Sequence, residues 1–598
     1  MLPTSLDLAT LTTAYRAGLK PSALFAHLHA QAAADTHHAW ISLLPEAELL
    51  VRAHALDAQD PANLPLYGVP FAVKDNIDLA GLPTTAGCPD FAYAPHADAA
   101  VVARLIAAGA IPLGKTNLDQ FATGLNGTRS PYGACRNAFQ PDYISGGSSS
   151  GSAVAVAAGQ VSFALGTDTA GSGRVPAAFN NLVGLKPSCG LLSSTGVVPA
   201  CRSLDTVSIF ALTAADAATL FGIARGFDET DAYSRPAEGH GRRFPAGQPF
   251  RFGVPRPDQL AFFGDAHNAG LFAAAAARLQ GLGGTPVELD FAPFLETARL
   301  LYGGPWVAER YHAIQDFIER QPESVFPVTR AITLSGAKPS AVDAFDAQYR
   351  LRALKRRCDA AWQQVDLILT PTAGYHPTIA AVESEPIRIN TELGHYTNFM
   401  NLLDYAAVAV PAAFRPDGLP FGVTLFAPAH QDLPLLELAA RWQADTGLPL
   451  GATGQPLPDQ AFPATPGADG MVQVAVCGAH LSGLPLNGQL TQRGGRLLRS
   501  VRSAPEYRFY ALAGGPPQRP GMVRVAEGGA RIDMEIWELP ARHFGSFVAA
   551  IPAPLGIGKV KLEDGSQVCG FICESGGLAD AEDITEYGGW RAWLGRRP

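Results

Sequence analysis

Two glycine-rich serine clusters and one lysine hold the residue types best suited to covalent catalysis. Ser148 lies in GGSSSGS, Ser172 lies in GTDTAGSGRVP, and Lys74 ends the apolar run GVPFAVK. A serine hydroxyl is a weak nucleophile until a neighbouring base takes its proton. A buried lysine can be that base, because loss of hydration lowers its pKa and favours the neutral amine. One serine as nucleophile, a second as relay and Lys74 as base form a set that needs no histidine.

The turn before Ser172 offers backbone donors for the same reaction. Ser172 follows a predicted strand that ends near Leu165, and three backbone N–H groups of the turn can converge on a developing oxyanion. They belong to Thr169, Ala170 and Gly171. Taken alone, a Gly-rich serine cluster is also typical of a flexible surface loop, and a lysine at a strand end is ordinarily a solvated charge. The occurrence of all these features together favours catalysis.

The run from Gly109 to Thr116 matches the phosphate-loop pattern G-x-x-x-x-G-K-T. A phosphate loop follows a strand and opens a helix, whereas a predicted helix precedes Gly109, and Pro112 removes one N–H from the run. We therefore predict a helix cap followed by a strand, and no nucleotide site.

Residues 147–151 match a second pattern, the G-x-S-x-G nucleophile elbow of α/β-hydrolases. An elbow needs a strand directly before it, and the preceding PDYISGG has little strand character. It also needs a downstream acid and histidine, and the sequence does not single out one of His376, His395 and His430. The context therefore disfavours a hydrolase triad.

Alternating helix and strand patterns must position these residues. An Ala-rich helix is predicted to end at Gly109, and a second small-residue helix precedes an extended run at residues 161–165. Residues 365–372 have the pattern of a strand buried on both faces, and residues 433–447 have an amphipathic helical pattern. Residues 1–455 are therefore predicted to form one α/β domain.

The composition of the chain changes after residue 455. Residues 456–469 are dense in Gly and Pro and poor in bulky apolar side chains, which is typical of a linker. Beyond them, MVQVAVCG, YRFYAL, ARIDMEIWEL and GKVKLEDGSQVCGFICE have the pattern of short strands. Residues 470–598 are therefore predicted to form a separate, smaller β-rich domain.

Composition also excludes several classes of function. The 598 residues are 47% apolar and 17% charged, which excludes a disordered chain. The formal charge of −9 repels phosphate backbones, so we expect no nucleic acid partner. No apolar run is long enough to span a membrane and no leader is evident, so we expect a cytoplasmic protein. The 8 cysteines and 14 histidines lack metal-ligand spacing, so we expect no metal, no disulfide and no cofactor.

The segments GVPFAVKDN, GGSSSGS and GTDTAGSGRVP, in this order, resemble the amidase signature family. The resemblance covers roughly residues 20–455. It implies that Lys74 is the base, that Ser148 is a bridging serine after a cis peptide bond, and that Ser172 is the acyl-forming nucleophile.

One position departs from the family pattern. Many members have Gly where this chain has Ala170, but a methyl group is small and should leave the oxyanion N–H intact. Asp168 and Arg174 are predicted to brace the nucleophile loop.

Residues 119–133 and 300–311 resemble the substrate pocket of the allophanate hydrolases within this family. The resemblance implies that Gly124, Tyr302 and Arg310 bind the substrate. Allophanate is a urea that carries a carboxylate, and the planar fork of an arginine donates two parallel hydrogen bonds to such a group. With the carboxylate held, the nucleophile is expected to attack the distal ureido carbonyl and release ammonia.

The C-terminal sequence resembles the extra domain of allophanate hydrolases, which is itself similar to the γ-glutamyl cyclotransferase fold. The resemblance rests on CGAHLSGLPLNGQL, YRFYAL and MEIWELP, and it implies that this domain decarboxylates an N-carboxycarbamate product. The candidate ligand-binding residues are His480, Asn487 and Arg508. A lone histidine is more often a structural group, and a scaffolding role for the domain stays open.

The predicted fold is α/β, an amidase signature fold with a large mixed β-sheet covered by helices, plus a smaller β-rich γ-glutamyl cyclotransferase-like domain. The resemblance implies hydrolysis of allophanate to ammonia and carbon dioxide in urea degradation, by a homodimer with a functional link to urea carboxylase. Three alternatives stay open: the glutamine amidase component of a tRNA-dependent amidotransferase, a general small-amide amidase with a C-terminal dimerisation module, and a non-catalytic binding protein. The C-terminal domain disfavours the first, and the intact lysine and serines disfavour the last.

Overall fold

The structure is a computed structural model, and it describes residues 2–236, 244, 246–463 and 471–596. These residues divide into two units, one formed by residues up to 463 and the other by residues 471–596.

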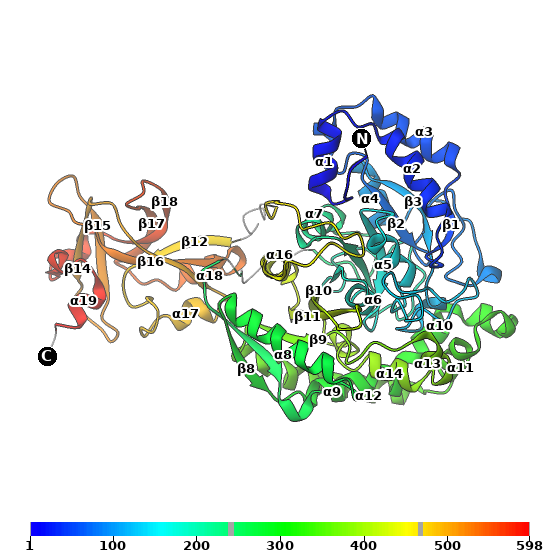
Figure 1. Cartoon of the computed structure of the whole chain (residues 1–598). Helices are drawn as coiled ribbons and strands as arrows, with labels where there is room; N and C mark the ends of the chain where they lie inside the picture. Colours follow the sequence, from blue (N-terminus) through cyan, green and yellow to red (C-terminus); the bar gives the residue numbers. More distant parts are fainter. Residues whose placement is uncertain (1, 237–243, 245, 464–470, 597–598) are drawn as a thin grey trace. The chain divides into compact units, whose positions relative to one another are not determined.

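Apolar strands and alanine-rich helices build the first unit (Figure 1). Its strands are β1 (Trp40–Leu43), β2 (Pro70–Lys74), β3 (Ile111–Thr116), β4 (Phe163–Asp168), β5 (Val183–Lys186), β6 (Thr206–Ala211), β7 (Phe250–Pro255), β8 (Gly284–Leu289), β9 (Leu367–Pro371), β10 (Tyr405–Phe414) and β11 (Pro420–Pro428). Its helices are α1 (Leu8–Arg16), α2 (Pro21–Ala33), α3 (Glu46–Asp57), α4 (Ala100–Ala107), α5 (Ser150–Ala157), α6 (Val175–Phe179), α7 (Ala214–Ala224), α8 (Ala266–Gly281), α9 (Ala292–Gly303), α10 (Trp306–Arg320), α11 (Pro327–Ser335), α12 (Ala341–Asp359), α13 (Ile379–Ser384), α14 (Arg388–Leu393), α15 (Phe399–Leu402) and α16 (Asp432–Thr446).

The strands of this unit form one mixed sheet in the order β1-β3-β2-β4-β6-β5-β10-β11-β9-β7-β8. Every residue of β2, β3 and β4 is buried, which requires cover on both faces of this part of the sheet. Helix α5 packs against β2 and β4. Because α5 contains only Ser, Gly, Ala and Val, it approaches the sheet closely and all of its residues are buried. The predicted α/β architecture with a large mixed sheet is confirmed.

Parallel pairing of β2 with β4 brings the catalytic candidates to one edge of the sheet. Val73 is in register with Leu165, so β2 ends at Lys74 close to the end of β4 at Asp168. The turn that carries the predicted nucleophile begins directly after β4. The sequence pattern placed the end of this strand near Leu165, because the GTD that follows is polar and includes a glycine.

The phosphate-loop pattern has the structure predicted for it, a helix end followed by a strand. Helix α4 ends just before Gly109, which has a φ of +103°, and β3 then runs through Lys115. Lys115 is buried and forms an ion pair with Asp75, with 3.0 Å between Nζ and Oδ1. This lysine therefore serves the fold.

The second unit is rich in β-structure, as predicted. Its strands are β12 (Met471–Val476), β13 (Arg496–Arg502), β14 (Tyr507–Ala511), β15 (Pro520–Arg524), β16 (Asp533–Pro540), β17 (Leu555–Lys561), β18 (Gln567–Cys573) and β19 (Glu582–Asp583), and its helices are α17 (Gly488–Thr491), α18 (Ala541–Ala549) and α19 (Trp590–Leu594). They form one sheet in the order β13-β16-β12-β18-β17 and a second in the order β15-β14-β19. The similarity to γ-glutamyl cyclotransferase stays a prediction, and residues 464–469 of the predicted linker lie outside the described residues.

Three general features bear on the function. Within the described ranges, no helix has the length and apolar character needed to cross a bilayer. The eight cysteines are all unpaired. In the same ranges, no cluster of three or more His, Cys, Asp or Glu side chains is arranged to hold a metal ion.

Candidate active site

Lys74 is fully buried at the end of β2 and faces two hydroxyl groups. Its Nζ donates to Ser148 Oγ and to Thr167 Oγ1, both at 2.7 Å. Burial lowers the pKa of Lys74 to about 7, although nearby carboxylates, Asp119 first among them, favour the charged amine. A large share of the lysine is therefore neutral near pH 7, which is the protonation state that a base requires.

Ser148 is held by the loop around Asp119. The peptide bond between Gly147 and Ser148 is cis, as the family resemblance predicted. Asp119 N donates to Ser148 O at 3.1 Å, and Asp119 Oδ2 accepts from Gly127 N at 3.1 Å. A Cβ atom would lie 2.1 Å from Asp119 Oδ2 at Gly147 and 2.5 Å from the same atom at Gly124. Only glycine fits at these two positions.

The loop that carries Ser172 is tied to a single carboxylate, that of Asp168. Arg174 donates to it with two groups, Nε to Oδ2 and Nη2 to Oδ1, both at 2.9 Å. The backbone N–H groups of Gly171 and Gly173 also donate to it, each at 2.9 Å. Asp168 therefore binds the chain on both sides of Ser172, which confirms the bracing role predicted for Asp168 and Arg174.

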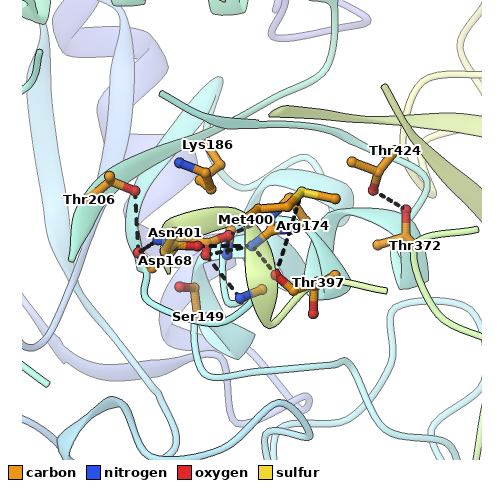
Figure 2. A network of polar contacts seen from close by, with 12 residues as sticks. Ser149, Asp168, Arg174, Lys186, Thr206, Thr372, Thr397, Met400, Asn401 and Thr424 are labelled. Atoms are coloured by element: carbon orange, nitrogen blue, oxygen red, sulfur yellow. Dashed lines mark hydrogen bonds and ion pairs between the residues drawn. The ribbon is translucent and has the colours of Figure 1, made fainter. Parts of the chain in front are cut away.

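This ion pair is buried and linked to a third segment of the chain (Figure 2). Arg174 Nη2 donates to Thr397 O at 3.3 Å and to Asn401 Oδ1 at 3.2 Å, and Asn401 Nδ2 donates to Asp168 O at 2.8 Å. Burial by itself raises the pKa of Asp168, but the Arg174 guanidinium outweighs it and holds that pKa below its usual value. The carboxylate therefore stays ionised and the loop stays anchored.

The bonds of this loop correct one part of the predicted oxyanion hole. Gly171 was predicted to donate to the oxyanion, but its N–H already donates to Asp168. In the described part of the chain, the backbone N–H groups of Thr169, Ala170 and Ser172 have no acceptor. These three are free to meet a ligand. The Thr169 side chain is occupied, because its hydroxyl donates to Asp205.

Ser172 itself is 2% exposed. Among the described residues its hydroxyl makes no hydrogen bond. The proton path from Ser172 to Ser148 therefore stays a prediction, and the contact between Ser148 and Lys74 is its structural part.

Tyr302, Arg310 and the loop next to Gly124 lie together, although they are far apart in the sequence. Arg310 lies on α10 and is 3% exposed. Its Nη1 donates to Thr123 Oγ1 at 3.0 Å, its Nη2 donates to Tyr302 Oη at 3.4 Å, and its Cζ lies 5.3 Å from the centre of the Tyr302 ring. The Arg310 charge also lowers the pKa of Lys74, so this group lies close enough to act on the base.

Comparison with known protein families matches residues 23–436 to the amidase family. The chain belongs to the amidase family. Residues 472–595 of this amidase match the allophanate hydrolase C-terminal domain. The amidase component of the glutamyl-tRNA(Gln) amidotransferase of Symbiobacterium thermophilum is 36% identical over 440 residues, which are 67% of this chain and 88% of that protein.

Two further relatives match both units of this amidase. The Kluyveromyces lactis allophanate hydrolase structure has 41% identity and a TM-score of 0.80, and the match covers 98% of this chain and 99% of that one. The urea amidolyase of Saccharomyces cerevisiae is 45% identical over 584 residues, which are 95% of this chain and 32% of that protein. The chain therefore spans about a third of the length of the curated urea amidolyases that it matches.

The sequence analysis missed two residues of this site. Thr167 positions Lys74 through the bond described above, and the polar step at the end of β4 is a signal that could have revealed it. Arg129 is 2% exposed, and its guanidinium donates to Thr123 O at 2.8 Å and to Pro386 O at 2.7 Å. No pattern in a single sequence indicates that Arg129 and Arg310 share the Thr123 loop.

The elbow pattern at residues 147–151 has no hydrolase geometry. Ser149 Oγ donates to Thr167 O at 3.1 Å and accepts from Thr167 N at 3.3 Å, so it bonds the neighbouring strand. His376 is buried against Phe179, with 3.7 Å between ring centres, and its Nε2 bonds Ile144 O at 2.8 Å. Both groups stabilise the fold.

In the second unit of the amidase, His480 lines a cavity. Its ring stacks on Phe571, with 4.9 Å between ring centres, and Nε2 lies 3.0 Å from Gln489 Oε1, an atom that can only accept. Burial lowers the pKa of His480. Asn487 Nδ2 donates to His480 O at 2.9 Å, so Asn487 holds the loop and is not among the residues that line the cavity.

Arg508 has a different position from the one predicted. Its Nε donates to Gly528 O at 3.1 Å, and its Nη1 lies 3.9 Å from Asp583 Oδ2. Arg508 is 42% exposed in its side chain, and the described residues that line the cavity of His480 do not include it. The prediction failed because alternation along β14 directs this side chain to the other side of the strand from the buried Tyr507 and Phe509.

Proposed function

We propose that this amidase hydrolyses allophanate with Ser172 as the nucleophile. The observation that carries the proposal is the pair of buried guanidiniums at Arg129 and Arg310, neither of which forms an ion pair with any described residue. A buried cation without a counter-charge favours an anionic ligand. Allophanate carries one carboxylate, and the similarity to the K. lactis allophanate hydrolase supports the same substrate.

The first half-reaction releases ammonia. Ser172 Oγ attacks the distal ureido carbonyl, and its proton passes through Ser148 to Lys74. The free N–H groups of Thr169 and Ala170 stabilise the charge that develops on the carbonyl oxygen. The bond between carbon and the terminal nitrogen breaks, and that nitrogen leaves as ammonia with the proton that Lys74 returns.

Water then cleaves the ester on Ser172 and gives N-carboxycarbamate, a dianion with a carboxylate on each side of one nitrogen. We place its decarboxylation in the cavity of the second unit, next to His480. One bond between carbon and nitrogen breaks, the electron pair stays on the nitrogen, and the nitrogen takes a proton. The products are carbon dioxide and carbamate, and carbamate takes a further proton and falls apart into ammonia and carbon dioxide. No cofactor is needed for these steps.

The proposal extends to the setting of the enzyme. A urea carboxylase is the class of enzyme that forms allophanate, and the match to urea amidolyases supports a functional link with one. We further propose a homodimer in the cytoplasm. Gel filtration with light scattering tests the oligomeric state, and a monomer at micromolar concentration would contradict the dimer.

Ammonia release from allophanate, biuret, malonamate and glutamine, measured in parallel, tests the proposed substrate. Biuret is the informative comparison, because it replaces the carboxylate of allophanate by an uncharged amide. We expect a strong preference for allophanate and no activity in Ser172→Ala. Preference for glutamine would favour the amidotransferase alternative, which the similarity to the S. thermophilum protein makes the second candidate.

The role of Arg310 has a test of its own. Arg310→Lys keeps the charge but loses the planar fork, so KM for allophanate should rise at least tenfold while biuret hydrolysis changes little. The control is Arg256→Lys, an arginine on the surface of the same unit. An equal loss on both substrates would contradict a contact with the carboxylate.

A further inference from the structure

The cavity next to His480 is small and has one charged wall. Its volume is about 70 Å³, several times the roughly 15 Å³ that one water needs. Apolar groups such as Leu486, Ile551 and Phe571 form much of its lining, and Gln489 and Arg519 supply polar groups. This size suits a ligand of a few non-hydrogen atoms and excludes a peptide.

Arg519 is the residue that makes this cavity selective. Its guanidinium forms no hydrogen bond and no ion pair with any described residue, and its Nε is buried without a partner. The Arg519 charge acts on His480 strongly enough to lower the histidine's pKa, so the two groups are neighbours. An arginine that is left unsatisfied at the wall of a cavity has its donors available for a carboxylate.

Surrounding contacts hold the two groups in place. A Cβ at Gly478 would lie 2.4 Å from the Pro520 ring, so the segment before His480 packs closely on the strand that follows Arg519. Gln489 fixes the imidazole from the other side. Arg508, in contrast, already bonds Gly528 and lies outside the lining.

We infer that this cavity is a binding site for a small dicarboxylate, in which Arg519 donates to one carboxylate and His480 lies beside the ligand. The inference rests on the proposed function, because N-carboxycarbamate is such a dicarboxylate. It names Arg519 as the residue that recognises this intermediate in the second unit. Arg519 is a binding residue here, and the bond that breaks is the one between carbon and nitrogen described above.

The experiment supplies the intermediate directly, so that it does not depend on the first unit. The dipotassium salt of N-carboxycarbamate is given to the full-length chain in the Ser172→Ala background, at mildly alkaline pH, and release of carbon dioxide is followed by ¹³C NMR. We expect this protein to accelerate the release over buffer. Adding Arg519→Gln should slow the release at least tenfold, and Arg508→Gln, the matched control, should leave it unchanged.

Failure of each idea gives a different result. If the Ser172-intact protein fails on allophanate, the proposed function falls, whereas the NMR assay still reports on the cavity. No acceleration by the Ser172→Ala protein, or equal rates with and without Arg519→Gln, would overturn the inference. Arg519→Lys keeps a positive charge and should retain more activity than Arg519→Gln at equal melting temperature. Equal losses in these two folded variants would also overturn it.

Discussion

Replacement of Lys74 by methionine tests whether a buried amine is the base of this reaction. Methionine fills most of the space of the lysine stem, and it removes the group that bonds Ser148 and Thr167. The variant also removes a buried polar group whose charged form is destabilised by burial, so we expect the protein to fold. We expect kcat/KM for ammonia release from allophanate to fall about 10³-fold.

The size of this loss follows from the pKa of Lys74. With the ordinary lysine pKa of 10.5, about 0.03% of the molecules would carry a neutral amine at pH 7, whereas a pKa of about 7 leaves about half of them neutral. Burial therefore enriches the base roughly 10³-fold, which lies inside the 10²- to 10⁴-fold range typical of general-base catalysis. Because only the neutral amine accepts a proton, kcat/KM of the unmodified protein should fall as the pH drops below about 7.

The assay compares Lys74→Met, Ser148→Ala and the double variant by ammonia release across this pH range. Lys74 and Ser148 act on the same proton, so the double variant should be no slower than the slower single variant. Lys338→Met, on the exposed side of the molecule, is the control. Losses that multiply in the double variant, or a flat profile between about pH 6 and pH 8, would refute the assignment of Lys74 as the base.

Two further predictions concern stability. Asp168→Asn leaves Arg174 buried without its counter-charge, so the free energy of unfolding in urea should fall by about 3–5 kcal/mol; an unchanged denaturation midpoint would contradict this, and Glu385→Gln, in an exposed ion pair with Arg388, is the control that should lose nothing measurable. Burial, together with the nearby Asp7, raises the pKa of Asp216 from 3.8 to about 8. The folded state thus keeps a proton that the unfolded chain has released, so this group's contribution to stability should be lost as pH rises from about 4 to about 8. Asp216→Asn should flatten the melting temperature over that window, and an unaltered slope would contradict the prediction.

Much of the catalytic centre could be predicted because its residues lie close in sequence to recognisable signals. Lys74 ends an apolar run, and Ser172 lies in a Gly-rich turn after another, so the pattern of burial already indicates that both occur at strand ends. The contact of Asp168 with Arg174 spans only six positions and follows from the turn between them. Local sequence therefore carries most of this information.

Other parts of the site depend on pairing that a single sequence does not reveal. Arg129 and Arg310 meet the same loop only because α10 folds back on it, and no periodic pattern encodes that contact. Gly171 was assigned to the oxyanion because glycines free the backbone, but where its N–H points depends on the position of Asp168. In the second unit, Arg508 and Arg519 are equivalent as sequence, and only the fold shows which one borders a cavity.

The reacting groups and the groups that recognise the substrate come from separate stretches of the chain. Lys74, Ser148 and Ser172 lie within the first third of the protein, whereas Tyr302 and Arg310 come from α9 and α10. Substitutions at Asp168 or Arg174 pass through a buried, uncompensated charge, so the reacting segment resists gradual change. Among the described residues, the two helices carry no such ion pair to the nucleophile loop. Divergence after duplication should therefore accumulate in α9 and α10, and a new amide specificity can arise there while the chemistry is inherited intact.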